Sequence, residues 1–154
     1  MYGYVKVGSA VPKLRVADCV YNKEEILKLV EAAAAKQVRV LSFPELSVTG
    51  YTCADLFFQA PLLHAAEQAI QEIAEATEAL NIFLLIGAPI AVDNQMFNCA
   101  VALYKGKLLG IVPKTHIPNY SEFYEERWFA SADDLLTEEI TYAGQNVPIG
   151  ADLI

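Results

Sequence analysis

The sequence has little positive charge. It carries 11 lysine and arginine residues against 19 aspartate and glutamate residues, so its formal net charge is −8 at pH 7. No cluster of basic side chains is present, and proteins need such a cluster to neutralise the phosphates of a nucleic acid. We therefore expect no nucleic acid among the partners of this chain.

Long hydrophobic runs are also missing. Hydrophobic residues make up 55% of the 154 residues, yet the apolar run Ile82–Val92 stops well short of the roughly 20 residues of a membrane-spanning helix. The N-terminal residues lack the basic and apolar regions of a signal peptide, so we expect no membrane partner and a cytoplasmic location. The hydrophobic content has two explanations that composition leaves open: a large buried core, or a surface that another subunit or further polypeptide covers.

Several kinds of site are excluded by what the sequence does not contain. Three cysteines at irregular spacing do not make a disulfide framework. Two isolated histidines, His64 and His116, lack the matched ligand spacing of a metal site. No glycine-rich loop for phosphate is present. We therefore expect neither a bound metal nor a nucleotide cofactor in this chain.

The three cysteines are weak candidates for a nucleophile. They are Cys19, Cys53 and Cys99. None has an adjacent basic residue in the sequence that would lower the pKa of its thiol, so we interpret them as buried or incidental. Cys53 is the least unfavourable of the three because it follows Glu45 closely.

Hydrophobic periodicity predicts a layered α/β fold. Strands are expected over Tyr4–Val11, Val38–Phe43, Ile82–Ile90, Phe97–Tyr104 and Leu108–Val112, the third interrupted by Gly87 and Pro89. Helices are expected from an N-cap at Asn22 to about Lys36, over Ala60–Leu80, and briefly over Glu122–Phe129. Turns are expected at Asp93–Gln95 and Lys105–Lys107, and the closing "VPIGADLI" is expected to enter another strand. The order β-α-β-α-β-β-β implies parallel crossovers followed by a hairpin meander, with strands buried on both faces of the sheet.

Two predicted strands end in proline followed by an ionisable residue. Glu45 comes after Pro44 and Lys114 comes after Pro113. Proline ends a central strand, so each charged side chain is expected at the edge of the sheet with little freedom. A desolvated carboxylate there would accept a proton near neutral pH, and a lysine there would stabilise a developing oxyanion. The alternatives are a turn cap for Glu45 and a solvated loop residue for Lys114.

The segments around these residues resemble a known family. "FPELSVTGYTCADLF" (43–57) and "GIVPKTHIPNYSEFYEERWF" (110–129) resemble the glutamate and lysine segments of the nitrilase superfamily, the carbon–nitrogen hydrolases. The opening "GYVKVGSAVPKLRVADCVYN" and the closing "GQNVPIGADLI" narrow the likeness. With them, essentially all 154 residues resemble the N-terminal glutaminase domain of the glutamine-dependent NAD synthetases.

The resemblance implies a role for five residues. Glu45 corresponds to the general base that activates a thiol, and Lys114 to the residue that stabilises the tetrahedral intermediate. Glu125 resembles an additional glutamate beside the triad, with the adjacent Glu126 as the alternative. Tyr51 and Phe123 resemble residues of the substrate pocket. The family's nucleophilic cysteine follows the segment that "VPIGADLI" resembles, so we expect it to be missing from this chain.

The resemblance also implies a fold and an activity. The family fold is a four-layer α-β-β-α sandwich, and residues 1–154 would form roughly its first half, a partial glutaminase domain with no synthetase domain. The full enzyme hydrolyses glutamine to glutamate and ammonia, and an ATP-dependent domain uses that ammonia to amidate deamido-NAD. ATP and Mg²⁺ are therefore expected only for that domain, and the 154-residue chain alone is expected to be inactive.

Two other hypotheses stay open at this stage. The chain belongs to another amidase or nitrilase of the same superfamily, or it is a non-catalytic module that retains the fold. If the thiol is missing, the alternative for Glu45 and Lys114 is an ion pair in a site without its nucleophile. A half-sandwich exposes an incomplete sheet, so we also predict a homo-oligomer.

Overall fold

The computed structural model describes residues 3–153. Its helices and strands, in chain order, are β1 (Val7–Ser9), α1 (Cys19–Ala35), β2 (Val40–Ser42), the 3₁₀ helix η1 (Ala54–Phe58), α2 (Ala60–Ala76), β3 (Phe83–Val92), β4 (Gln95–Tyr104), β5 (Lys107–Pro113), η2 (Glu125–Arg127), η3 (Ala132–Asp134), β6 (Glu139–Tyr142) and β7 (Gln145–Pro148). The predicted order β-α-β-α-β-β-β is confirmed as far as β5.

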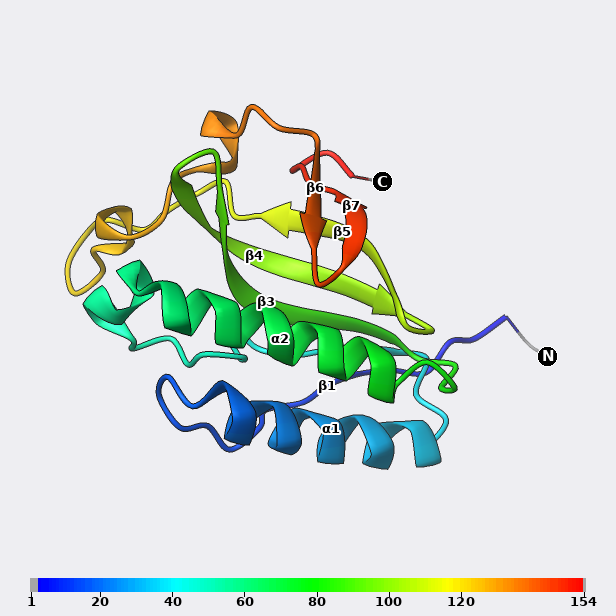
Figure 1. The fold of residues 1–154 in the computed structure, drawn as a ribbon. Coiled ribbons are helices and arrows are strands. Elements are labelled where there is room, and N and C mark those ends of the chain that lie inside the picture. Colours follow the sequence, from blue (N-terminus) through cyan, green and yellow to red (C-terminus); the bar gives the residue numbers. More distant parts are fainter. Residues whose placement is uncertain (1–2, 154) are drawn as a thin grey trace.

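A five-stranded mixed sheet forms the centre of the fold. Its strand order is β1-β2-β3-β4-β5, with β1, β2 and β3 parallel and β3, β4 and β5 antiparallel (Figure 1). β6 and β7 form a separate hairpin, which joins the edge of β5 through one parallel bridge between Ile111 and Ile149. The expected crossovers and meander are both present.

Both long helices pack on the same face of the sheet. The two crossovers run in the same direction along the sheet, and the fixed handedness of such connections places α1 and α2 on one side. The helices lie side by side in Figure 1. Their buried side chains, which include Ile26, Val30, Ile70 and Ile73, share one core with the alternate β3 residues Leu84, Ile86, Ala88 and Ile90.

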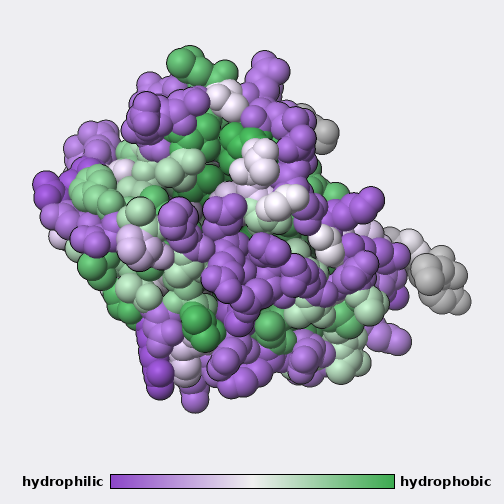
Figure 2. Space-filling view, in the orientation of Figure 1, coloured by the Kyte–Doolittle hydropathy of each residue, from purple (hydrophilic) through white to green (hydrophobic). Residues whose placement is uncertain are grey.

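The opposite face of the sheet has no helix over it within residues 3–153. Side chains that alternate with the core set lie on this face, and here Val7 and Val112 are exposed while Leu85 is half-buried. The prediction that the strands are buried on both faces is therefore wrong for the described chain. The helix side is different, because hydrophilic side chains cover most of it (Figure 2).

The start of α1 differs from the prediction. Asp18 is the N-cap, and its side chain accepts a hydrogen bond from the Tyr21 amide at 3.0 Å. Asn22 lies inside the helix and is fully buried. Its side chain bonds to both backbone groups of Arg15 and to the carbonyl of Val48. The Asn22 side chain joins two loops and does not cap the helix, so the prediction of an N-cap at Asn22 is wrong.

Several boundaries also differ. The strands predicted over Tyr4–Val11 and Val38–Phe43 shrink to three residues each. The helix predicted to reach Leu80 ends at Ala76, where Thr77 donates its hydroxyl to the Ile73 carbonyl. β3 continues through Gly87 and Pro89 to Val92. Only three residues of Glu122–Phe129 are helical, in η2.

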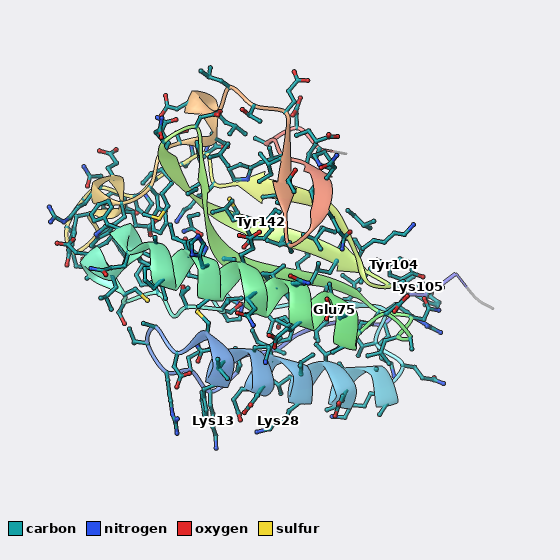
Figure 3. All side chains as sticks on the ribbon, viewed as in Figure 1. Lys13, Lys28, Glu75, Tyr104, Lys105 and Tyr142 are labelled. Carbon is teal, nitrogen blue, oxygen red and sulfur yellow. The ribbon has the colours of Figure 1, made fainter. Side chains whose placement is uncertain are left out.

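The β6–β7 hairpin was not predicted. Its two-residue turn, Ala143–Gly144, has positive φ at both positions, as do Asp93–Asn94 and Lys105–Gly106 in the other two hairpins. Tyr142 is buried, and Figure 3 shows it between α2 and the hairpin. Val147 and Pro148 of the closing segment lie in β7, Ile149 makes one bridge to β5, and the chain then turns, so only the start of the strand predicted there is present among the described residues.

Candidate active site

Glu45 lies in a tight turn that packs against β3. After β2, the Phe43 amide donates to the Leu85 carbonyl at 2.9 Å, and the chain then turns through Leu46 at φ 51°. A Cβ on Gly87 would lie 2.3 Å from the Leu46 nitrogen. Glycine is therefore the residue that lets the turn approach the strand so closely, and this approach fixes the position of Glu45.

Lys114 lies at the matching end of β5. Its amide donates to the Asn98 carbonyl at 2.8 Å, and its carbonyl accepts from the Ala132 amide at 3.0 Å. The ammonium Nζ donates to Glu45 Oε1 at 2.7 Å. Two strand ends that are 69 residues apart in sequence thus bring their charged side chains into contact.

Glu125 completes a line of charged groups. Its Oε2 accepts from Lys114 Nζ at 2.9 Å, and its Oε1 accepts from the Tyr51 hydroxyl at 2.6 Å. The Glu125 side chain is only 3% exposed. Glu126 is exposed instead and accepts from Asn119 at 2.7 Å. Of the two adjacent glutamates, Glu125 is the one that contacts Lys114.

Asn98 is a member of this cluster that the sequence did not single out. Its side-chain amide donates to Glu45 Oε1, the same oxygen that accepts from Lys114. The residue is buried in β4, opposite Pro89 of β3. One signal was available: Asn98 is the only polar residue between Met96 and Leu103 in an otherwise apolar strand.

Phe123 lies outside this hydrogen-bonded cluster. Its ring packs edge-on against Tyr120, with the centroids 5.9 Å apart. The structure therefore brings together Glu45, Lys114, Glu125 and Tyr51, and it leaves Phe123 in the loop that precedes η2.

The charges of this cluster are mutually stabilising. Partial burial by itself lowers the pKa of Lys114, but hydrogen bonds and attraction from Glu45 and Glu125 outweigh it, so the pKa is raised. Lys114 is therefore an ammonium at neutral pH. Burial and the hydrogen bond to Glu125 raise the pKa of Tyr51, which keeps that phenol neutral.

Glu45 is less desolvated than the sequence predicts. Its side chain is 40% exposed, against 29% for Lys114. The cause is the uncovered face of the sheet, toward which Glu45 points. The desolvation predicted for this carboxylate is therefore incomplete in the described chain.

None of the three cysteines is available to Glu45. Cys53 is buried and its thiol donates to the Thr49 and Gly50 carbonyls. Cys99 follows Asn98 in the strand, so it points to the helix side of the sheet while Asn98 points to Glu45. Burial raises the pKa of Cys19 to about 11 and that of Cys99 further. All three thiols are protonated core residues.

A second set of contacts holds η2 in place. Arg127 donates to both oxygens of Asp55 at 2.7 Å, and the Trp128 indole donates to Asp55 Oδ1 at 3.0 Å. These bonds keep the pKa of Asp55 well below its usual range. They tie η2, where Glu125 lies, to η1, which follows Tyr51 closely in the sequence.

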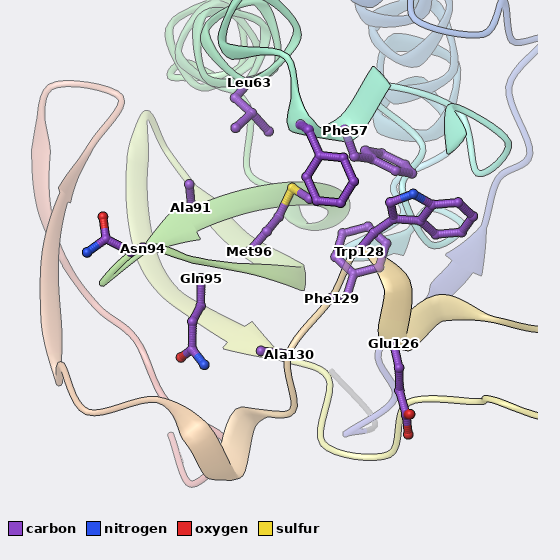
Figure 4. Close-up of a pocket in the computed structure, with 11 residues that line it drawn as sticks. Phe57, Leu63, Ala91, Asn94, Gln95, Met96, Glu126, Trp128, Phe129 and Ala130 are labelled. Atoms are coloured by element: carbon purple, nitrogen blue, oxygen red, sulfur yellow. The ribbon is translucent and has the colours of Figure 1, made fainter. Parts of the chain in front are cut away.

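Two hollows flank these contacts. One of about 330 Å³ lies on the uncovered face beside Glu45, Asn98 and Lys114, and its apolar lining includes Phe43, Leu85, Ala100 and Val112. A second of about 420 Å³ lies between the aromatic rings of η1, those of Trp128 and Phe129 just after η2, and the start of β4 (Figure 4). Glu126 borders the second hollow but points away from its rings in Figure 4. Only the first hollow adjoins the charged cluster.

The cluster contains a proton acceptor and a cationic donor side by side. The ammonium of Lys114 has three protons, and two of them go to Glu45 and Glu125, so the third is left for another acceptor in the hollow. Across residues 3–153, no group of three or more His, Cys, Asp or Glu side chains is arranged to hold a metal ion. These groups are suited to acid–base chemistry on a polar molecule in the first hollow.

The comparison with protein families gives one match over nearly the whole chain. Residues 6–151 match the model of the carbon–nitrogen hydrolases. Among curated proteins, the chain is 34% identical over 152 residues to the glutamine-dependent NAD(+) synthetase of Mycobacterium leprae, covering 99% of this chain and 22% of that protein. The synthetase of Aquifex aeolicus is 34% identical over 125 residues, or 81% of this chain and 22% of the relative.

Solved structures give the same picture. The glutamine-dependent NAD(+) synthetase of Cytophaga hutchinsonii superposes with a TM-score of 0.87 at 29% identity, over 95% of this chain and 25% of that one. An amidase from Nesterenkonia sp. superposes with a TM-score of 0.66 at 19% identity, over 90% of this chain and 52% of that one, and shows a shared fold. The chain thus spans about a quarter of the synthetases it matches.

No described helix is both long and apolar enough to cross a membrane.

Proposed function

We propose, since this chain belongs to the carbon–nitrogen hydrolase family, that Glu45, Lys114 and Glu125 form part of a site that hydrolyses the side-chain amide of glutamine. The observation that carries the proposal is the contact of Lys114 with both carboxylates, at 2.7 Å and 2.9 Å, beside a hollow on the uncovered face. The similarity to the glutamine-dependent NAD(+) synthetases supports glutamine as the substrate.

The proposal gives each charged residue one task. Glu45 takes the proton of an attacking thiol and later delivers it to the departing ammonia. Lys114 points its remaining proton at the oxyanion of the tetrahedral intermediate. Glu125 is buried and bonded to Tyr51, so it holds Lys114 in position.

The thiol has to come from outside these 154 residues. Cys19, Cys53 and Cys99 are buried, and none of them makes a hydrogen bond to Glu45. The 154-residue chain alone should therefore be inactive. The same proposal places ATP and Mg²⁺ in a separate synthetase domain, which would use the released ammonia to amidate deamido-NAD, and it assigns no cofactor to the residues described here.

The test is glutamine hydrolysis by the longest natural polypeptide that contains these 154 residues. Release of glutamate and ammonia is measured for the wild type and for the variants Glu45→Gln and Lys114→Met. We expect each variant to lose about 100-fold or more in kcat, the usual contribution of a general base or an oxyanion donor. Glu126→Gln is the matched control and should keep wild-type activity, because Glu126 is exposed and bonded only to Asn119.

Other outcomes separate the alternatives. A preference for simple amides or nitriles over glutamine would identify a different carbon–nitrogen hydrolase with the same charged cluster. Full activity of Glu45→Gln would overturn the assignment of the base, and absence of any amide hydrolysis would favour the non-catalytic module.

A further inference from the structure

We propose that Asn98 is a positioning residue for Glu45: with Lys114, it occupies Oε1 so that Oε2 becomes the oxygen that accepts and returns the proton. The inference rests on the proposed function, because it states which oxygen of Glu45 transfers the proton in that reaction. It adds a residue to the site and a distinction between the two oxygens of the base.

The hydrogen bonds to Glu45 all fall on one oxygen. Oε1 accepts from Lys114 Nζ at 2.7 Å and also from the side-chain amide of Asn98. No donor among residues 3–153 bonds to Oε2. A carboxylate oxygen has two lone-pair positions, so two donors leave Oε1 without room for a proton. Oε2 has both positions open.

The position of Asn98 is fixed by burial and strand pairing, so its amide stays on Oε1 of Glu45. It is 3% exposed, and it lies in the central strand β4, which pairs with β3 on one side and β5 on the other. Its carbonyl accepts the Lys114 amide at 2.8 Å. One residue therefore fixes the backbone of Lys114 and the carboxylate of Glu45 at the same time. Positioning of this kind is more accurate from a paired strand than from a loop.

The proton balance follows from this arrangement. A thiol S–H bond breaks as an O–H bond forms at Oε2 of Glu45. The sulfur electron pair forms a bond to the carboxamide carbon, and the π pair of its C=O bond moves to the oxygen, which becomes the oxyanion. When the C–N bond of the tetrahedral intermediate breaks, the proton on Oε2 passes to the leaving nitrogen and ammonia departs. Throughout both transfers Oε1 keeps its two donors, so Glu45 does not need to rotate.

The first experiment uses the 154-residue chain and needs no thiol. In ¹⁵N NMR, the side-chain amide signals of Asn98 should differ between the wild type and Glu45→Gln, because the variant replaces the charged acceptor of that amide with a neutral one. Asn146 gives the matched control, because it is exposed and bonds to Thr141 in the β6–β7 hairpin. Asn98 signals that are the same in the wild type and in Glu45→Gln would overturn the contact and with it the inference.

The second experiment measures glutamine hydrolysis by the longest natural polypeptide with these residues. Asn98→Leu keeps the size of the side chain but removes the donor, so Oε1 competes for the proton and kcat should fall about 10-fold or more at unchanged KM. Asn98→Asp should fall further, because a second carboxylate faces Glu45. Asn146→Leu should leave kcat unchanged.

The outcomes distinguish the two proposals. Suppose that the wild type hydrolyses glutamine and that Asn98→Leu is folded by circular dichroism. A wild-type kcat for this variant would then overturn the role of Asn98 and leave the proposed function standing. A lower kcat combined with a higher KM would indicate general damage to the pocket and would also count against positioning. A wild type that hydrolyses no amide would remove the proposed function itself.

Discussion

At the scale of single residues, the site is a line of alternating charge anchored at a buried carboxylate. Glu125 is the least exposed member, and its two oxygens are satisfied by Lys114 and Tyr51. Burying a carboxylate without hydrogen-bond donors destabilises the folded state, and these two contacts offset that cost for Glu125. Lys114 gains from the same arrangement, because the two carboxylates keep it protonated.

The contact of Tyr51 with Glu125 leads to a prediction about stability and pH. Tyr51→Phe removes the donor to Oε1 of Glu125 and should cost about 1 kcal/mol of the free energy of unfolding at pH 7. Folding raises the pKa of Tyr51 above its ordinary value of 10.0, so its contribution is complete below pH 10 and is lost as the pH rises toward the folded pKa. The gap between wild type and variant should therefore narrow above pH 10.

Urea unfolding from pH 7 to pH 11 measures this gap. Tyr4→Phe is the control, since Tyr4 is 92% exposed. Equal stability of Tyr51→Phe and wild type at pH 7 would contradict the contact.

At the scale of elements, the position of Glu45 depends on how one turn meets one strand. The Val48 amide donates to the Gly87 carbonyl at 3.2 Å, and the positions of Pro44, Glu45 and Leu46 leave no space for a Cβ on Gly87. A glycine inside a strand weakens it, yet here the same glycine lets the turn lie on the strand.

Gly87→Ala should therefore be strongly destabilising. The new methyl group would meet backbone atoms at 2.3 to 2.8 Å, and backbone cannot move aside as a flexible side chain can. We expect a loss of about 2–3 kcal/mol in the free energy of unfolding, as for other overpacked sites. Gly8→Ala is the matched control in β1, because its Cβ would meet only side-chain atoms at 3.5 Å or more. Urea unfolding that gives the two variants equal stability would refute this account.

At the scale of the whole molecule, the two faces of the sheet are unlike. The helix side has a continuous core, while the opposite side exposes apolar residues such as Val7 in β1 and Val112 beside the first hollow. The relatives are about four to five times longer than this chain, since it covers 22–25% of their length. Exposed apolar surface of this kind favours association, so we keep the prediction that the 154-residue chain self-associates.

Light scattering as a function of concentration tests this prediction. Val7→Lys and Val112→Lys place charges on the uncovered face and should shift the chain toward the monomer. Val20→Lys is the control: Val20 is 63% exposed, nearly as much as Val7 at 67%, but it lies on α1 on the other side of the sheet. A wild type that stays monomeric at every concentration would contradict the prediction.

The sequence by itself determined the order of the long helices and strands as far as β5, the fold class and the two strand ends that carry Glu45 and Lys114. Each of these follows from local signals: hydrophobic period, proline after a strand, and a charged residue after the proline. Resemblance added Glu125 and Tyr51, which local chemistry would not have selected.

Only the tertiary structure decided how these residues meet. The choice of Glu125 over Glu126 depends on the exact course of a loop, and the contact of Asn98 with Glu45 depends on strand register across 53 residues. The burial of Asn22 and the one-sided cover of the sheet arise in the same way, from packing between distant segments. Such packing is not readable from local propensity, because tertiary contacts between distant segments override it.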